Sequence, residues 1–222
     1  MSVHKKKDLS GENLSYKFLM LGDQMVGKTS VLERYVNNTF KSNYLTTIGM
    51  DKRYKRLEIN NTDVDVFITD TAGEERFRSL TKMFYKGADG IFLGFSLTEK
   101  KSLESINYWV EQIEQNCNKD KALCLVLFGN KCDDRDNIEV KKEDIDLTQK
   151  KHNLTYFETS AKENINIQDL FEFLIKNAII KNGDLKNIGL PENAFIDDIK
   201  INIKENQKLE IVKSKPKKKR FC

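Results

Sequence analysis

The sequence predicts an α/β protein in which an open, mostly parallel β-sheet of about six strands carries helices on both faces. Three observations indicate this class. Apolar runs of strand length recur, most are followed by a turn and a segment with helical spacing, and one pair is joined by a tight turn alone. Near-continuous apolar strands alternating with amphipathic helices are typical of doubly wound sheets, so we expect a single domain of this architecture.

The expected strands and helices follow one another in pairs. These pairs are YKFLMLG (16–22) with VLERYV (31–36), GIFLGFSL (90–97) with KKSLESINYWVEQIEQN (100–116), ALCLVLFGN (122–130) with VKKEDIDLTQKK (140–151), and LTYFETS (154–160) with IQDLFEFLIKNAI (167–179). The two remaining runs, 51–60 and 63–70, meet in a short turn around Asn60, which predicts a hairpin and one antiparallel edge strand. A ligand is expected in the crevice at the carboxyl ends of the parallel strands.

The chain of 222 residues is long enough for one domain of ordinary size and a terminal extension. We expect a flexible N-terminal extension over residues 1–13, the domain over 14–181, and a flexible C-terminal tail over 182–222. The tail is rich in Lys, Asn, Asp and Glu, which favours a mobile segment. Within it, FIDDIKINI (195–203) is apolar enough to pack on the domain.

Charge and cysteine content exclude several classes of function. The formal net charge is +4, but six positive charges lie between residues 213 and 220, so the rest of the chain is close to neutral. This argues against a nucleic-acid-binding face on the domain. No apolar run is long enough to span a membrane and no signal peptide is visible, so we expect a cytosolic protein. The cysteines lack the spacing of a zinc site or a disulfide framework; they are Cys117, Cys124, Cys132 and Cys222.

The stretch GDQMVGKTS, residues 22–30, fits the phosphate-binding pattern G-x-x-x-x-G-K-[ST] between an expected strand and an expected helix. The glycines let successive backbone N–H groups turn inward, and the helix adds the positive end of its dipole. We expect Lys28 to reach the β- and γ-phosphates and the Thr29 hydroxyl to bind Mg²⁺. The remaining expected nucleotide contacts of this loop are Asp23, Gln24, Met25, Val26, Gly27 and Ser30.

Two further loops point to guanine as the base. Asn130-Lys131-Cys132-Asp133 follows one expected strand, and Ser160-Ala161-Lys162 follows the next. A carboxylate at Asp133 can accept hydrogen bonds from the ring N–H and the exocyclic amine of guanine, whereas adenine lacks this pair of donors. A backbone N–H in the second loop suits the guanine carbonyl oxygen. By itself the first loop is equally well explained as a polar turn.

Asp70-Thr71-Ala72-Gly73 lies at the end of a third expected strand. We expect Asp70 to hold Mg²⁺ through water and the Gly73 N–H to meet the γ-phosphate of GTP. An aspartate capping the following helix is an alternative that is compatible with this role.

These motifs, in the order GDQMVGKT, TTIGMD, DTAGEERFRSL, NKCD and ETSAK, resemble those of the Ras superfamily of small GTPases, most of all its Rab branch. The resemblance covers roughly residues 14–181. It implies a switch that binds GTP with Mg²⁺, hydrolyses it to GDP, and acts in vesicle-mediated membrane transport.

The resemblance also implies roles for further residues. Phe40 should stack on guanine, Tyr44 should close over the phosphates, and Thr47 should bind Mg²⁺ and the γ-phosphate. Residues 40–52 and 70–85 would form the two switch segments, which the γ-phosphate orders. Lys131 should lie along the nucleotide, and Asn130 should tie the base loop to the phosphate loop. The residues expected to take part in hydrolysis are Glu74, Lys28 and Thr47.

Glu74 stands where the family usually has a glutamine that orients the attacking water. Its carboxylate brings a like charge toward the γ-phosphate and cannot donate a hydrogen bond, so we expect slow intrinsic hydrolysis. Gln24 and Met25 stand where small residues are common. These departures leave open a second interpretation, a hydrolysis-impaired GTP-binding scaffold of the same fold. A P-loop ATPase or kinase is a third, which would leave the NKCD motif unexplained.

The expected partners follow from the resemblance. They are effectors, an exchange factor, a GTPase-activating protein and a chaperone that binds prenylated proteins. Lys52 and Thr69 replace two aromatic residues that many Rab proteins show to effectors, so we expect an unusual effector set. Trp109 shares a helix face with Ile106, Val110 and Ile113, and we expect plain core packing for it.

The tail ends in KSKPKKKRFC, a basic cluster next to the terminal Cys222. Prenylation of Cys222 together with the basic residues would give the two signals that stable membrane anchoring requires. We therefore expect association with the cytosolic face of an organelle or vesicle. The alternatives are a nuclear localisation signal, which PKKKR resembles, or a solvated tail without a targeting role.

Overall fold

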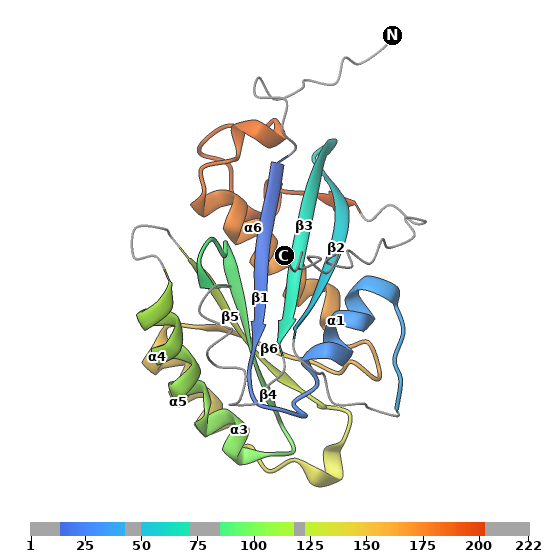
Figure 1. Ribbon diagram of the computed structural model, residues 1–222, viewed down its shortest axis with the longest axis vertical. Coiled ribbons are helices and arrows are strands. Elements are labelled where there is room, and N and C mark those ends of the chain that lie inside the picture. Colours follow the sequence, from blue (N-terminus) through green and yellow to red (C-terminus); the bar gives the residue numbers. More distant parts are fainter. Residues whose placement is uncertain (1–13, 43–49, 72–84, 118–122, 203–222) are drawn as a thin grey trace, which may run out of the picture.

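A seven-stranded β-sheet forms the centre of the described part of the chain (Figure 1). The computed structural model describes residues 14–42, 50–71, 85–117 and 123–202. The strands are β1 (Leu14–Leu21), β2 (Met50–Ile59), β3 (Thr62–Thr71), β4 (Gly90–Ser96), β5 (Cys124–Asn130), β6 (Thr155–Glu158) and β7 (Ile201–Asn202). The α-helices are α1 (Lys28–Asn37), α3 (Lys100–Glu104), α4 (Ile106–Asn116), α5 (Lys142–His152) and α6 (Ile167–Lys181).

The strand order is β6-β5-β4-β1-β3-β2-β7. Neighbouring strands from β6 to β3 run parallel, whereas β2 is antiparallel to β3 and β7 is antiparallel to β2. The predicted mostly parallel α/β fold is therefore confirmed. One detail differs: β2 was expected at the edge of about six strands, and β7 lies outside it as a seventh.

The hairpin predicted from two apolar runs forms between β2 and β3. Its register runs from Met50 opposite Thr71 to Ile59 opposite Thr62. The turn residues Asn60 and Asn61 have φ values of 45° and 63°, a left-handed conformation that asparagine tolerates better than most residues.

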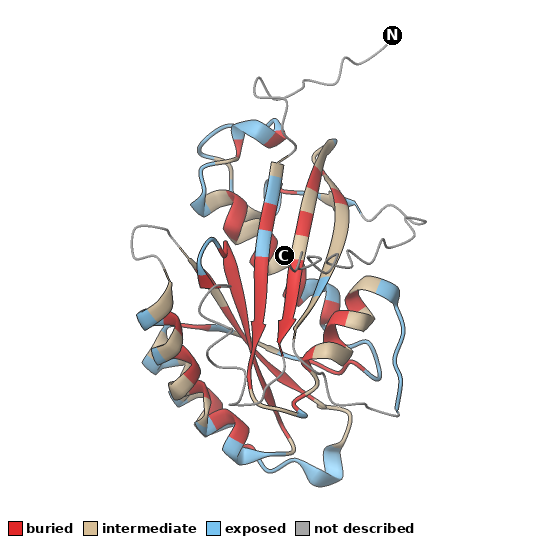
Figure 2. Ribbon diagram, in the orientation of Figure 1, coloured by how far each residue is buried: buried red, intermediate tan, exposed pale blue. Residues whose placement is uncertain are grey.

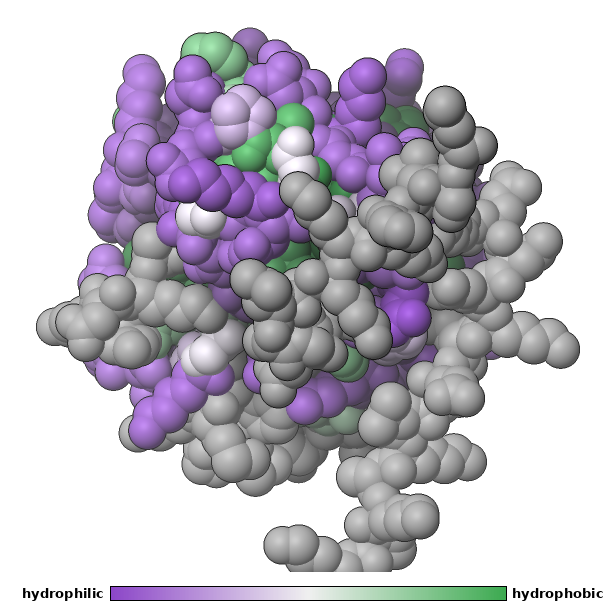
Figure 3. Space-filling view, turned by 90° about the horizontal axis from the view of Figure 1, so that it is seen from above, coloured by the Kyte–Doolittle hydropathy of each residue, from purple (hydrophilic) through white to green (hydrophobic). Residues whose placement is uncertain are grey.

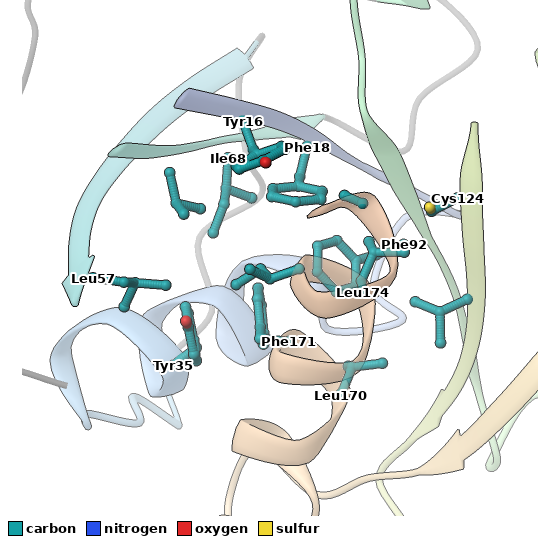
Figure 4. Close-up of a cluster of buried hydrophobic side chains, with 14 of the residues drawn as sticks. Tyr16, Phe18, Tyr35, Leu57, Ile68, Phe92, Cys124, Leu170, Phe171 and Leu174 are labelled. Atoms are coloured by element: carbon teal, nitrogen blue, oxygen red, sulfur yellow. The ribbon is translucent and has the colours of Figure 1, made fainter. Parts of the chain in front are cut away.

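Helices cover the two faces of the sheet as two layers (Figures 1 and 2). On one face α1 and α6 enclose an apolar cluster in which Tyr35 of α1 and Phe171 of α6 stack with their ring centroids 3.8 Å apart (Figure 4). On the other face α3, α4 and α5 pack through residues such as Leu103, Trp109 and Ile145. Apolar side chains alternate between these two clusters along β1, which explains its near-continuous apolar sequence.

Residues 182–202, here called the C-terminal strap, continue from α6 and pack on the first of these layers. The strap contains two short 3-10 helices, η3 (Lys186–Ile188) and η4 (Ile196–Asp198), and then β7. Its side chains Leu185, Ile188 and Ile199 are buried in the cluster formed with α1 and α6.

Hydrogen bonds fix both ends of the strap. At its start, the Tyr16 hydroxyl donates to Asp184 at 2.7 Å, and the Asn182 side chain donates to Asp89 at 2.8 Å. At its end, Asn60 in the hairpin turn donates its backbone N–H to the Lys200 carbonyl, and its side-chain oxygen accepts from the Lys200 N–H at 2.7 Å. The strap therefore joins the end of α6 to the tip of the β2–β3 hairpin.

This packing differs from the expectation of a mobile segment beyond residue 181, and it agrees with the expectation that residues 195–203 can pack on the domain. Polar residues dominate the composition of the strap, and its few buried apolar residues are too widely spaced to give a helix or strand period. The division of the chain into three parts remains a prediction. Residues 1–13 and 203–222 lie outside the described residues.

Seen from the end of the sheet that carries the hairpin turn, the described surface is largely hydrophilic, and apolar residues show only as small patches (Figure 3). Among the described helices, none combines the length and the apolar character needed to cross a bilayer.

We predict that Ile199→Ala lowers the free energy of unfolding by about 2–4 kcal/mol, because it leaves a cavity where the strap enters the core. Phe195→Ala is the control, since Phe195 is in the same strap but 77% exposed, and it should change the value by less than about 0.5 kcal/mol. Urea unfolding measures both. Equal effects of the two substitutions would contradict the packing of the strap.

Candidate functional site

The loop between β1 and α1 is shaped by two glycines that no other residue could replace without a clash. A Cβ atom on Gly22, which has φ of 141°, would lie 2.1 Å from the Gly94 carbonyl oxygen. A Cβ atom on Gly27, which has φ of 96° and precedes α1, would lie 2.2 Å from the side-chain nitrogen of Asn130. The loop therefore packs directly on β4 and on the end of β5.

Lys28 begins α1 and its side chain is buried under this loop, only 5% exposed. Its Nζ donates to the carbonyl oxygens of Gly22 at 2.9 Å and Asp23 at 2.7 Å. Burial lowers the pKa of Lys28 to about 8, although the nearby carboxylates of Asp70 and Asp23 oppose the shift. An anion in the loop would offset the loss of hydration of this ammonium group.

Thr29 and Asp70 form the part of the site that suits a metal ion. The Thr29 hydroxyl donates to Asp70 Oδ2 at 2.5 Å, while Asp70 Oδ1 is buried and has no hydrogen-bond partner among the residues that the structure describes. Burial raises the pKa of Asp70, and the hydrogen bond from Thr29 and the charge of Lys28 oppose that shift. A buried carboxylate oxygen without a partner next to a hydroxyl matches the oxygen ligands that Mg²⁺ prefers. These residues therefore fit the expected metal.

The side-chain amide of Asn130, at the end of β5, connects three loops. Its Nδ2 donates to the Val26 carbonyl at 3.0 Å, and its Oδ1 accepts from the Ala161 N–H at 3.2 Å. Asn130 is 3% exposed, so both bonds are shielded from water. The loops after β1, β5 and β6 are thereby held in one arrangement.

Asp133 lies at the rim of a cavity of about 200 Å³ between these loops. The Ser160 hydroxyl donates to its Oδ1 at 2.5 Å, and Lys162 Nζ is 3.7 Å from its Oδ2. The Asp133 side chain is 13% exposed, so its carboxylate is largely withdrawn from solvent. The residues lining the cavity are Met25, Gly27, Ser30, Phe40, Lys41, Ser42, Asn130, Lys131, Asp133, Asp134, Ala161 and Lys162.

Most of the site residues predicted from the sequence thus lie around one cavity and one buried lysine. Tyr44, Thr47, Gly73 and Glu74 lie outside the described residues, as does Cys222. Lys131 lies on the cavity wall with a φ of 71°. Met25, also with positive φ, is 50% exposed.

Sequence reasoning missed two residues that support these loops. Arg34 in α1 donates from Nε to the Ala161 carbonyl at 2.8 Å and from Nη2 to the Lys162 carbonyl at 3.0 Å. Trp109 in α4 donates from its indole Nε1 to the Asp23 carboxylate at 2.9 Å. The core packing expected for Trp109 is confirmed, but the hydrogen bond is additional. A helix-periodic pattern carries no signal for either contact, because each partner lies far away in the chain.

Comparison with known proteins gives a consistent result. The sequence matches the Ras family over residues 17–180. It is 34% identical over 191 residues to Ras-related protein Rab-13 of Rattus norvegicus, covering 86% of this chain and 93% of that protein. It is 37% identical over 182 residues to Ras-related protein Rab-10 of Diplobatis ommata, covering 80% and 90%. It is 35% identical over 193 residues to Ras-related protein Rab-8A of Rattus norvegicus, covering 87% and 92%.

Proposed function

The chain belongs to the Ras family of small GTPases, and from that membership we propose that it is a Rab-type switch with slow GTP hydrolysis, bound to a membrane through its tail. The assignment of the nucleotide site rests on the Asp133 carboxylate. Ser160 donates a hydrogen bond to this carboxylate, which lies beside a cavity lined by three loops. The fold positions these loops at the carboxyl ends of parallel strands, where ligands bind in such sheets.

We assign guanine to the cavity. The two oxygens of Asp133 would accept from the ring N–H and the exocyclic amine, and a backbone N–H of the Ser160-Ala161-Lys162 loop would donate to the guanine carbonyl oxygen. Phe40 and Lys131 line the same cavity, which suits contacts with the two faces of a flat base. An adenine in this place would leave the carboxylate without its donors.

We assign the phosphates to the loop of residues 22–30. Lys28 would leave the carbonyl oxygens of Gly22 and Asp23 and bind the β- and γ-phosphates, which keep it fully charged. Thr29 and Asp70, together with Thr47, would hold Mg²⁺, which supplies charge neutralisation to those phosphates when bound.

In hydrolysis, a water molecule attacks the γ-phosphorus, the bond to the bridging oxygen breaks, and GDP and inorganic phosphate leave. Lys28 and the Gly73 N–H would stabilise the charge on the γ-phosphate, and the backbone of Thr47 would add a further donor. Glu74 can accept a hydrogen bond from the water but cannot donate one to the phosphate. We therefore propose that the unaided reaction is slow.

The switch segments, residues 40–52 and 70–85, would be ordered by the γ-phosphate and would select partners of the GTP form. Effectors, an exchange factor, a GTPase-activating protein and a prenyl-binding chaperone are the partner classes of the family. Lys52 on β2 is exposed, and the neighbouring Thr69 on β3 is buried. At these two positions the hairpin therefore presents a lysine to effectors in place of two aromatic side chains. We propose an unusual effector set.

The basic tail and Cys222 would attach the protein to the cytosolic face of an organelle or vesicle. Each Lys or Arg near anionic lipid contributes about 1 kcal/mol of binding, and a prenyl chain would add the second signal.

Asp133→Asn should lower the affinity for GTP at least about a hundredfold, because two charge-assisted hydrogen bonds to guanine are lost. It should raise the affinity for the xanthine nucleotide, whose base has an oxygen in place of the guanine amine and can accept from the new amide. Isothermal titration with both nucleotides measures this. Asp134→Asn is the matched control, since Asp134 lines the same cavity and should leave the guanine preference unchanged. Unchanged GTP affinity in Asp133→Asn would refute the assignment.

Glu74→Gln should hydrolyse GTP about tenfold faster or more in a single-turnover assay without partners, because the amide restores a donor toward the γ-phosphate. Glu75→Gln controls for the loss of a negative charge next to this position. Fast turnover by the native protein would show that the proposal about Glu74 is wrong. If nucleotide recovered from the purified protein is persistently GTP, the hydrolysis-impaired scaffold replaces the cycling switch.

Intact protein from its native cells should carry the mass increment of one isoprenoid, and Cys222→Ser should lack it. The same cells should show the native protein in the membrane fraction and the variant in the soluble fraction. A native protein of unmodified mass would remove the proposed anchor and leave the tail as a solvated or nuclear-targeting segment.

A further inference from the structure

The single tryptophan of the chain connects helix α4 to the phosphate loop. Trp109 is 5% exposed and packs with Ile106, Val110 and Ile113. Its indole N–H points out of this cluster and donates to Asp23 Oδ1 at 2.9 Å. Asp23 directly follows the Gly22 that packs on β4, so the bond joins α4 to the first turn of the loop.

Asp23 accepts hydrogen bonds through two different groups. Its backbone carbonyl accepts from Lys28 Nζ at 2.7 Å, and its side-chain carboxylate accepts from Trp109. The carboxylate is therefore close to the lysine but is directed to the indole.

A carboxylate beside a polyphosphate site carries a physical disadvantage. If it turned inward, it would repel the phosphates, and it could form an ion pair with Lys28 that competes with them. Two like charges at van der Waals distance repel in water, and the repulsion is several times stronger near a protein surface. A neutral N–H donor can hold the carboxylate outward without adding a positive charge that would itself attract the phosphates.

We propose that Trp109 is a positioning residue for nucleotide binding: its indole N–H holds the Asp23 carboxylate away from Lys28 and the phosphates, and so slows nucleotide release. This inference rests on the proposed nucleotide site. The tryptophan then has two roles. Its ring fills the core, and its N–H fixes the position of the Asp23 carboxylate in the phosphate loop.

The test measures dissociation of fluorescently labelled GDP from the full chain. Trp109→Phe keeps an aromatic ring in the core and removes the donor, and dissociation should become about tenfold faster, which equals 1.4 kcal/mol. Asp23→Asn alone gives the release rate of a neutral side chain with the indole donor still in place, and it is the reference for the double variant. The double variant, Trp109→Phe with Asp23→Asn, should release GDP at nearly the rate of this reference, since a neutral amide neither repels phosphate nor competes for Lys28.

Because the chain has one tryptophan, a second replacement is possible that leaves the core intact. A tryptophan analogue with sulfur in place of the ring N–H, incorporated during expression, alters only this position. It should reproduce the faster release even if Trp109→Phe folds poorly. Ile113→Val, in the same buried helix face, is the control for loosened packing: it should lower the melting temperature and leave the dissociation rate unchanged.

The outcomes separate this inference from the proposed function. If the native protein does not bind labelled GDP, the nucleotide site itself is wrong. If it binds GDP but the analogue releases it at the native rate, or if Asp23→Asn fails to rescue Trp109→Phe, then Trp109 is a core residue only.

Discussion

The side-chain amide of Asn130 is the contact on which the arrangement of the site depends. Both of its polar atoms are used, Nδ2 by the Val26 carbonyl and Oδ1 by the Ala161 N–H, and the residue is almost fully buried. Leaving a buried polar group without a partner destabilises a protein by about 1–3 kcal/mol, so movement of either loop away from Asn130 is opposed. Arg34 donates to the Ala161 carbonyl at 2.8 Å, so α1 holds the loop after β6 in addition to Asn130.

Close backbone contact is the second constraint, and it explains why small residues recur at the carboxyl ends of the strands. Gly22 lies against the carbonyl of Gly94, and a Cβ atom on Gly94 would lie 2.4 Å from the Phe128 ring. The phosphate loop can therefore lie against the β4 backbone because Gly22 has no side chain, whereas the missing side chain of Gly94 makes room for the Phe128 ring of β5. Since β1, β4 and β5 are parallel neighbours, the same close packing brings the loop after β5 within reach of Gly27.

The sequence was sufficient to predict the features that depend on local periodicity and on motif spacing. Alternating apolar strands and helices predicted the sheet, and the motifs around Lys28, Asp70 and Asp133 predicted which loops meet, because strands of one parallel sheet share an edge. Contacts between residues far apart in the chain could not be predicted. Trp109 has the spacing of a core residue whether or not its N–H has a partner, and the apolar character of residues 195–203 indicated that they can pack without indicating which part of the domain buries Ile199.

Strand β2 relates the C-terminal strap to the candidate site. Its first residue, Met50, lies opposite Thr71, next to the Asp70 proposed to hold Mg²⁺, and its last residue, Ile59, lies opposite Ile201 of the strap. The whole length of β2 therefore separates β7 from the end of the sheet that carries the candidate phosphate loop. The strap also occupies the sheet edge only at Glu58 and Ile59, the far end of that strand. Ile201 and Asn202 therefore lie at the hairpin end of the sheet, opposite the end that carries the candidate nucleotide loops.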